Sequence, residues 1–347
     1  MTTSGSIPKL KVAILDDYQD VALSITGKWA KTTLSDGSSL LSRLSIDSFR
    51  ETLHDENALG DRLSPYDIIC AMRERTKFPA SLLDRLPDLK LIATTGTYNL
   101  GIDVVHAKSK GIVVSGTDFG AAYTTTHEHI WALIFSAARH IVQEDRNIKA
   151  CNPRWQSVVP TGLSGKTLGL IGLGKLGSPV AEIARAFGMR VLAWSPNLTA
   201  ARASRVPGVT YSPSKTHLLS NSDIISVHLV LSPATYHIIS MDDLALLKPT
   251  AYLINTSRGP LVDETALIKV LKENKIAGAA LDTFDIEPLP LDHPFRELGD
   301  KVTLSPHNAY VSHESWKMFW DQTVENIAAF LEGKPGRPLA AGVTPFI

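Results

Sequence analysis

The chain has 347 residues, which is long enough for two domains that each bury a core. Lys and Arg together number 35, as do Asp and Glu, so the zero net charge provides no overall field for nucleic acid or an anionic membrane. No run of about 18 apolar residues is present to span a membrane, and no apolar stretch typical of a secretory signal begins the sequence, so we expect a cytoplasmic protein.

Four strand candidates occupy the first part of the chain, at residues 11–17, 67–72, 89–96 and 111–116. Each is a short run rich in β-branched residues, and longer helical patterns separate them. This alternation is typical of βαβ units around a parallel sheet. A long amphipathic stretch from Thr124 to about Lys149 follows, and it predicts a helix that connects two domains.

A second series of six strand candidates then begins, with helical stretches between most of them. They lie at residues 166–174, 190–195, 223–231, 251–259, 276–284 and 301–308. Such a series predicts a doubly wound sheet. The last segment, HESWKMFWDQTVENIAAFLEGK, is amphipathic and helical, and because it follows the complete second series we expect it to pack on the first domain.

The predicted fold class is therefore α/β, with two Rossmann-like doubly wound parallel-sheet domains. Residues 119–311 form a dinucleotide-binding domain, which is inserted into a flavodoxin-like substrate domain made of residues 1–118 and 312–347.

A glycine motif, Gly172-Leu173-Gly174-Lys175-Leu176-Gly177, follows the apolar run TLGLI directly and opens a helical stretch. Strand before and helix after is the context that makes this motif a dinucleotide site. The first glycine permits a tight turn, the second lets the backbone approach a pyrophosphate, and the third allows close packing. The following helix offers its free N–H groups to the phosphates.

The end of the next strand bears on the choice of cofactor. An NAD site has an Asp or Glu there to bind the ribose 2′-hydroxyl, but this chain has Ser195, followed by Pro196 and Asn197. Without a carboxylate nothing repels a 2′-phosphate, and Ser195 and Asn197 can both donate hydrogen bonds to one. NADP(H) is thus favoured and NAD(H) is possible. Arg202 and Arg205 could add charge, although surface solubility is an alternative role.

Three later segments carry candidate catalytic residues where strands end: NTSRG around Arg258, DTFDIEP around Glu287, and SPHN around His307. The carboxyl ends of parallel strands line one crevice, so all three segments face the same place. Arg can bind a carboxylate bidentately and polarise the adjacent keto oxygen. His can give that oxygen a proton as hydride arrives, and Glu can stabilise the protonated imidazole.

At this point the chain resembles the D-isomer-specific 2-hydroxyacid dehydrogenases, of the glyoxylate/hydroxypyruvate reductase kind, over nearly its whole length. The matching pieces are GLGKLG, LKPTAYLINTSRGPLVDETAL, AGAALDTFDIEPLP and SPHN, in that order. The resemblance implies reduction of a small 2-keto acid to the D-2-hydroxy acid, and a homodimer built largely through the cofactor domains.

The resemblance also implies roles for particular residues. It implies that Arg258, Glu287 and His307 form a catalytic triad and that Asp282 holds the nicotinamide carboxamide. Further cofactor contacts would be Lys175, Leu176, Thr256 and Ser257. The backbone N–H groups of Gly96 and Thr97 would hold the substrate carboxylate, although Tyr98 and Asn99 put side chains where many relatives have little, which indicates an altered pocket.

No metal site is predicted. His127 and His129 are two residues apart on a helix and face different directions, so they cannot chelate one ion together. Cys70 and Cys151 lie far apart and have no CxxC pattern. The sequence does not establish whether Arg73, Tyr98, Asn99 or Trp316 lines the substrate pocket.

Two other functions stay open. One is a non-catalytic NAD(H)-sensing protein that resembles the corepressor relatives, although those carry long extra tails and this chain ends soon after its last predicted helix. The other is an enzyme similar to formate dehydrogenases, although those have Gln where this chain has Glu287.

Overall fold

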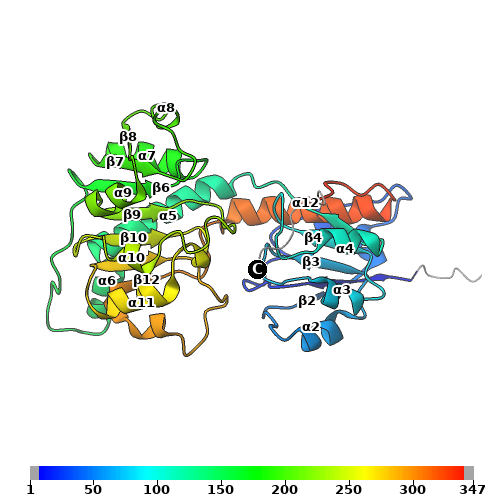
Figure 1. Cartoon of the computed structure of the whole chain (residues 1–347). Helices are drawn as coiled ribbons and strands as arrows, with labels where there is room; N and C mark the ends of the chain where they lie inside the picture. Colours follow the sequence, from blue (N-terminus) through cyan, green and yellow to red (C-terminus); the bar gives the residue numbers. More distant parts are fainter. Residues whose placement is uncertain (1–7, 340–347) are drawn as a thin grey trace, which may run out of the picture. The chain divides into compact units, whose positions relative to one another are not determined.

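The computed structural model describes residues 8–339, and these fall into two compact units (Figure 1). Unit 1 contains the chain up to Ala121 and from Ser312 onward, and unit 2 contains Ala122–Val311. Each unit is built on a parallel sheet, which confirms the predicted fold class. The outermost parts of the predicted substrate domain, residues 1–7 and 340–347, lie outside the described residues.

The sheet of unit 1 has five parallel strands in the order β2-β1-β3-β4-β5, the flavodoxin-like arrangement. The strands are β1 (Leu10–Ile14), β2 (Leu44–Ser48), β3 (Ile68–Ala71), β4 (Leu91–Thr94) and β5 (Val113–Ser115). The helices are α1 (Lys28–Lys31), η1 (Leu40–Arg43), α2 (Glu56–Leu63), α3 (Ala80–Asp84), α4 (Val104–Ser109) and α12 (His313–Leu331). Every residue of β3 and β4 is buried, as expected for central strands covered on both faces.

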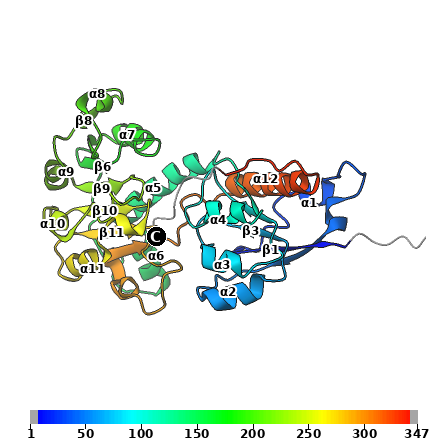
Figure 2. The ribbon, with the colours of Figure 1, turned by 45° about the vertical axis from the view of Figure 1, so that its right-hand side comes forward.

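The last helix, α12, belongs to unit 1 and packs on β4 (Figures 1 and 2). Its aromatic face is buried, with Trp320 6.5 Å from the ring of Trp29. The buried Asn326 side chain donates a hydrogen bond of 2.7 Å to the Gly116 carbonyl. Trp316 is also buried in this unit, 5.9 Å from the ring of Phe319. Unit 1 therefore combines chain segments about 200 residues apart.

The sheet of unit 2 has seven parallel strands in the order β12-β11-β10-β9-β6-β7-β8, in which chain order reverses between β6 and β9 (Figure 2). The strands are β6 (Thr167–Ile171), β7 (Arg190–Trp194), β8 (Val209–Tyr211), β9 (Ile224–Val227), β10 (Tyr252–Asn255), β11 (Gly278–Leu281) and β12 (Val302–Leu304). This is the order of dinucleotide-binding sheets, with one further strand at the β12 edge.

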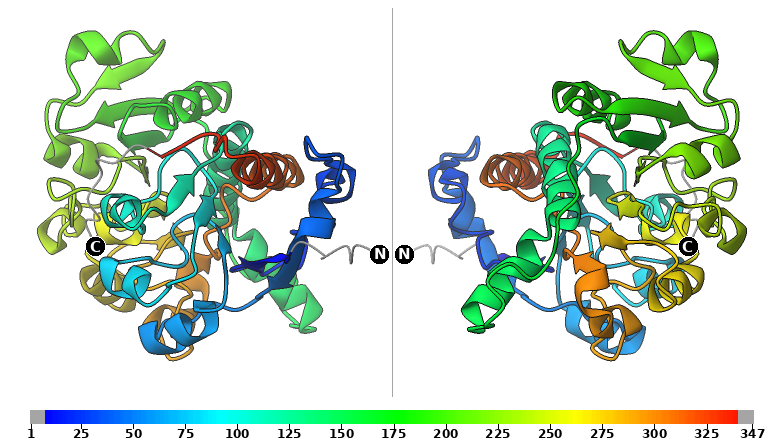
Figure 3. Two further views of the ribbon diagram at one scale, coloured as in Figure 1. Left: turned by 90° about the vertical axis from the view of Figure 1, so that its right-hand side faces the viewer. Right: turned by 90° about the vertical axis from the view of Figure 1, so that its left-hand side faces the viewer.

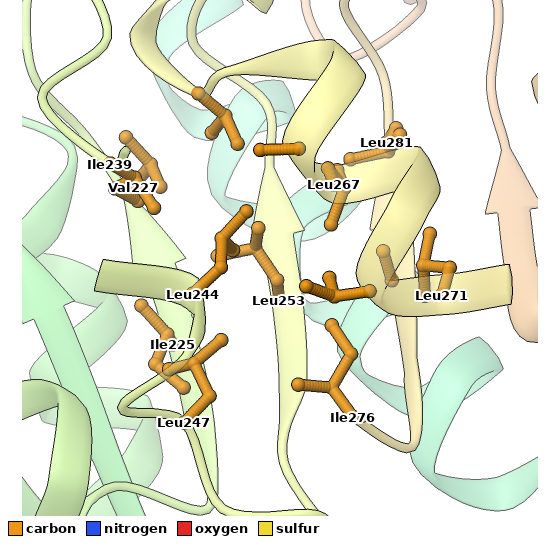
Figure 4. Close-up of a cluster of buried hydrophobic side chains, with 14 of the residues drawn as sticks. Ile225, Val227, Ile239, Leu244, Leu247, Leu253, Leu267, Leu271, Ile276 and Leu281 are labelled. Carbon is orange, nitrogen blue, oxygen red and sulfur yellow. The ribbon is translucent and has the colours of Figure 1, made fainter. Parts of the chain in front are cut away.

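Helices cover the sheet of unit 2. They are α5 (Ala122–Arg139), α6 (Ile141–Lys149), α7 (Gly177–Ala186), α8 (Ala200–Ala203), α9 (Lys215–Asn221), α10 (Met241–Leu244) and α11 (Glu264–Lys272), with short turns η2 (Gly259–Leu261), η3 (Pro294–Glu297) and η4 (Gly299–Lys301). The side chains of Leu253, Leu267 and Leu271 fill the core between the sheet and α11 (Figure 4). This packing holds the start of α11 against the end of β10.

One expectation about an individual element was wrong, and two strands were not predicted. The stretch 124–149 forms two successive helices, α5 and α6, because His140 takes a left-handed backbone conformation (φ 52°) that ends α5 (Figure 3). The edge strands β2 and β8 were not predicted. Both are partly exposed, and neither shows the continuous apolar run of a central strand.

Candidate active site

The glycine loop joins β6 to α7 at the point where the strand order of unit 2 reverses. Gly172 has a positive φ of 109°, and a Cβ there would lie 2.8 Å from the His228 carbonyl oxygen. A Cβ on Gly177 would overlap the Gly172 carbonyl oxygen, whereas Gly174 faces open space. No side chain caps the start of α7. The packing of the three glycines fits a tight dinucleotide-binding turn, and no side chain caps the first N–H groups of α7.

Lys175 and Leu176 complete this loop. The Lys175 ammonium lies 5.4 Å from the centre of the Tyr123 ring, and the Lys175 carbonyl is 3.2 Å from His127 Nε2. Leu176 precedes the first turn of α7. These contacts connect the glycine loop to α5.

The loop after β7 lacks a carboxylate. Ser195 is half-buried and Asn197 is exposed. The guanidinium of Arg202 bends back onto this loop, where Nη1 donates to the Asn197 carbonyl at 3.2 Å. A cation therefore lies beside the position where the acidic residue of an NAD site would stand.

The segment after β10 carries Thr256, Ser257 and Arg258. The Ser257 hydroxyl donates to the Val227 carbonyl at 2.8 Å, and this bond ties the segment to β9. The Thr256 hydroxyl is buried and has no hydrogen-bond partner among residues 8–339, so it is a candidate to bond a ligand. Arg258 is half-buried, and its Nη1 donates to the Ser257 carbonyl at 2.7 Å.

Asp282 follows β11 and is fully buried. Its carboxylate accepts the backbone N–H groups of Asn308 at 2.7 Å and Ala309 at 2.9 Å, and His129 Nε2 lies 3.3 Å away. Burial alone raises the pKa of Asp282, but the hydrogen bonds from His129, Ser305 and Asn308 outweigh it, so the pKa lies below its ordinary value. Asp282 therefore fixes the turn that carries His307.

His307 and Glu287 are in direct contact. Nδ1 of His307 lies 2.5 Å from Oε2 of Glu287, and the other Glu287 oxygen accepts the Phe284 N–H at 2.9 Å. The His307 backbone is left-handed (φ 52°), and the Tyr310 ring meets the imidazole edge to face at 5.5 Å. Because a carboxylate only accepts, Nδ1 carries a proton in this pair, which leaves Nε2 to act on a substrate.

The loop after β4 of unit 1 contains Gly96 and Thr97. The Gly96 N–H donates to the Thr117 hydroxyl at 2.8 Å, so a carboxylate could bind this N–H only by displacing Thr117. Thr97 is exposed. Arg73 is buried against Gly96, and its guanidinium lies 5.6 Å from the centre of the Tyr98 ring. Asn99 is buried, and its amide donates to the Thr94 hydroxyl at 2.8 Å.

Two histidines of unit 2 were missed by sequence reasoning. His129 bonds the Ser305 hydroxyl at 2.8 Å and lies against Asp282. The resemblance suggested that the stretch around His129 lies near the cofactor, but sequence reasoning gave this residue no role of its own. Burial, together with the nearby His127, lowers the pKa of His228, which follows β9, to about 3. His228 is therefore neutral beneath the glycine loop. Its position directly after a buried strand was the available signal.

Residues 8–339 contain no group of three or more His, Cys, Asp or Glu side chains placed to hold a metal ion. In the same residues, no helix has both the length and the apolar character needed to cross a membrane.

The fold and this site define a nicotinamide-dependent oxidoreductase of two parallel-sheet units. The family described as "D-isomer specific 2-hydroxyacid dehydrogenase, NAD binding domain" matches residues 131–309. A glyoxylate reductase of Korarchaeum cryptofilum is 38% identical over 259 residues, which cover 74% of this chain and 77% of that protein. The chain belongs to the family of D-isomer-specific 2-hydroxyacid dehydrogenases.

Solved structures give the same result. A phosphoglycerate oxidoreductase from Vibrio cholerae is 32% identical and superposes with a TM-score of 0.84, covering 93% of this chain and 99% of that one. An acyclic imino acid reductase in complex with NADPH and D-Arg is 30% identical, with a TM-score of 0.68 over 95% of this chain and 100% of that one.

Proposed function

We propose that the protein reversibly reduces a small 2-keto acid, of the glyoxylate or hydroxypyruvate kind, to the D-2-hydroxy acid with NADP(H). The observation that carries this proposal is the contact between His307 and Glu287. His307 follows the carboxyl end of β12, and the glycine loop follows the carboxyl end of β6 in the same sheet. It supplies a proton donor where a nicotinamide would lie. The family and the glyoxylate reductase relative support the substrate class.

In this mechanism Arg258 binds the substrate carboxylate and polarises its keto group, while Nε2 of His307 protonates the keto oxygen. Glu287 stays ionised, holds Nδ1–H and stabilises the imidazolium. The nicotinamide supplies the hydride in reduction and accepts it in oxidation. Within unit 1, we propose that the backbone N–H of Thr97 can bind a carboxylate, and that the Gly96 N–H can do so if Thr117 gives way.

The residues proposed to hold the cofactor lie around the glycine loop and at the ends of β7, β10 and β11. They are Gly172, Gly174, Lys175, Leu176, Gly177, Ser195, Asn197, Thr256, Ser257 and Asp282. The preference for NADPH is supported by the missing carboxylate at Ser195 and by the Arg202 guanidinium on the same loop. The relative that binds NADPH shows that this fold accommodates that cofactor.

The test of this preference is Ser195→Asp, with kcat/KM measured for NADPH and NADH. The new carboxylate repels a 2′-phosphate and binds the 2′-hydroxyl of NADH, so the ratio should move toward NADH. Ser204→Asp, the same change at an exposed position further along the chain, serves as a matched control for an added charge nearby. Equal or better use of NADPH by the Ser195→Asp variant would overturn the preference.

We also propose a homodimer formed through unit 2. Helix α6 buries none of its residues, and Ile141, Val142 and Ile148 are all more than half exposed, as is Trp155 after it. An apolar surface of this kind is typical of an interface. Light scattering after size exclusion should give twice the monomer mass, and Ile148→Glu should lower this mass.

The cytoplasm is the proposed compartment, because Cys70 and Cys151 are both free thiols.

The deciding assay measures the loss of NADPH or NADH absorbance with glyoxylate, hydroxypyruvate, pyruvate and bulkier 2-keto acids. In parallel, it measures the gain of NADH absorbance when NAD is mixed with formate. We expect turnover with a small keto acid. His307→Ala should lower kcat by about 2 to 4 orders of magnitude with little change in cofactor affinity. Arg258→Ala should impair both substrate binding and turnover. In Glu287→Gln the imidazolium is less stable, so as pH rises the activity of keto-acid reduction should be lost at a lower pH than in the parent.

Three outcomes would contradict this mechanism. Absence of turnover with every keto acid would favour a sensor of the cofactor, and turnover of formate alone would favour the formate dehydrogenase reaction. If Glu287→Gln keeps the parent pH profile while His307→Ala stays active, the proton comes from another group.

A further inference from the structure

A second ionisable cluster lies behind the loop that carries Glu287. It consists of Glu264, Asp285 and His293, and we refer to it as the outer cluster. Glu264 begins α11, and its Oε1 lies 2.9 Å from His293 Nε2. Only 17% of the Glu264 side chain and 12% of the His293 side chain are exposed. The pair is thus shielded from solvent, unlike an ordinary surface ion pair.

The hydrogen bonds of His293 fix its tautomer. Nδ1 accepts the Phe295 backbone N–H at 3.2 Å, which caps the turn η3, so Nδ1 carries no proton. The ring proton is therefore on Nε2, where it is donated to Glu264. Both ring nitrogens have a defined partner, and the imidazole holds the Glu264 carboxylate in one orientation.

The other oxygen of Glu264 reaches the backbone of the Glu287 loop. Oε2 accepts the Asp285 N–H at 3.3 Å, and the preceding N–H, that of Phe284, is the one that bonds Glu287 Oε1 at 2.9 Å. Two consecutive N–H groups are thus held by two carboxylates. One carboxylate faces His307 and the other faces His293.

The same stretch of backbone also contacts the segment that follows Arg258. A Cβ on Gly259 would overlap the Phe284 carbonyl group, so the two loops pack backbone against backbone. Glu264 lies just beyond this contact, at the start of α11. A shift of the Phe284–Asp285 backbone would therefore be transmitted both to Glu287 and to the Arg258 segment.

The charged and titratable groups that face Asp285, the third member of the outer cluster, are Glu264, Asp263, His237 and His293. Burial, together with repulsion from Glu264, raises the pKa of Asp285 to about 6. Glu264 is thus held beside another acid. Its two specific hydrogen bonds account for its orientation.

On the basis of the proposed function, we propose that Glu264 and His293 are positioning residues that hold the Phe284–Asp285 backbone so that Glu287 meets His307. Neither residue touches the substrate or the cofactor in this role. They act through the backbone that orients the Glu287 carboxylate.

The test compares Glu264→Ala with Glu264→Gln and with Glu273→Ala, an exposed glutamate at the other end of α11. Glu264→Ala should lower kcat by about tenfold to a hundredfold, because small misplacements of catalytic groups have effects of this size. The pH profile of kcat for keto-acid reduction should move toward lower pH, as in Glu287→Gln. The dissociation constant of NADPH should change less than about twofold. Glu264→Gln keeps an acceptor for the Asp285 N–H and should recover part of kcat. Glu273→Ala should match the parent.

A measurement independent of turnover separates this inference from the proposed function. The proton on His307 Nδ1, assigned with His307→Asn, should give a downfield NMR resonance because it is shared with Glu287 at 2.5 Å. In Glu264→Ala this resonance should move upfield or broaden, and in Glu273→Ala it should stay.

The outcomes have distinct meanings. An unchanged resonance in Glu264→Ala overturns the positioning role. The double variant Glu264→Ala/Glu287→Gln gives a second test: if its pH profile shifts by the sum of the shifts in the two single variants, the residues act independently and the positioning role is also overturned. A moved resonance with unchanged kcat supports positioning and overturns the catalytic role of the Glu287–His307 pair.

Discussion

Replacing Asp282 by Asn would remove a buried charge that the surrounding backbone is arranged to bind. The carboxylate accepts N–H groups of Asn308 and Ala309, and it has no exposed surface. An Asn can offer one oxygen, but its NH₂ would face the second backbone N–H. A buried donor left without an acceptor costs about 1–3 kcal/mol, and breaking a buried charged pair costs about 3–5 kcal/mol.

We therefore expect Asp282→Asn to lower the free energy of unfolding of unit 2 by about 3 kcal/mol. At about 2–4 °C per kcal/mol for a unit of this size, the melting temperature should fall by about 6–12 °C. The measurement is calorimetry of the protein without cofactor at pH 7. Asp292→Asn, the same change at an exposed position nearby, should leave the melting temperature unchanged.

The pH dependence gives an internal check. Because the folded-state pKa of Asp282 is lowered, its stabilising effect is complete above the unfolded-state pKa of about 4 and is lost as pH falls through the folded-state pKa. The difference between parent and variant should thus shrink below about pH 4. A variant within 2 °C (about 1 kcal/mol) of the parent at pH 7, or a difference that persists undiminished at pH 2, would refute the reasoning.

Three further predictions concern unit 2. The pKa of Asp285, raised to about 6, means that stability is lost as pH rises from about 4 to 6. Asp285→Asn should therefore raise the melting temperature at pH 7 but not at pH 4, and the gain in stability should be no more than about 1 kcal/mol because Asp285 is only partly shielded from solvent. Gly177→Ala should weaken NADPH binding at least tenfold in a fluorescence titration, because the new Cβ displaces the Gly172 carbonyl; unchanged binding would contradict the tight turn. Leu253→Ala in the core of Figure 4 should cost about 2–5 kcal/mol in urea denaturation, against about 0.5 kcal/mol for the exposed Leu246→Ala, and equal costs would argue against that core.

The central strands could be predicted from the sequence because burial on both faces requires continuous apolar runs, as in Ile68–Ala71 and Ile224–Val227. The glycine loop could be predicted because its spacing follows from the steric demands of a pyrophosphate. The strands β2 and β8 could not, because polar and partly exposed residues interrupt their apolar pattern.

The site was predictable at the level of residue types and their order, but less so in its hydrogen bonds. Nothing in the spacing of Asp282 indicated that both its oxygens bond the turn after His307. The use of the Gly96 N–H by Thr117, 21 residues later, depends on packing that a local pattern does not record. The catalytic and binding roles assigned to these residues stay predictions until the variants are measured.

The placement of α12 in unit 1 has a consequence for synthesis on the ribosome. The strands β1 to β5 leave the exit tunnel first, whereas α12, which covers β4 and bonds Gly116 through Asn326, follows only after all of Ala122–Val311 has been translated. At about 5–20 residues per second this delay is about 10 to 40 s. During that time the face of β4 that α12 will cover is open, so the nascent chain exposes an apolar surface that chaperones can bind and that premature termination would leave permanently uncovered.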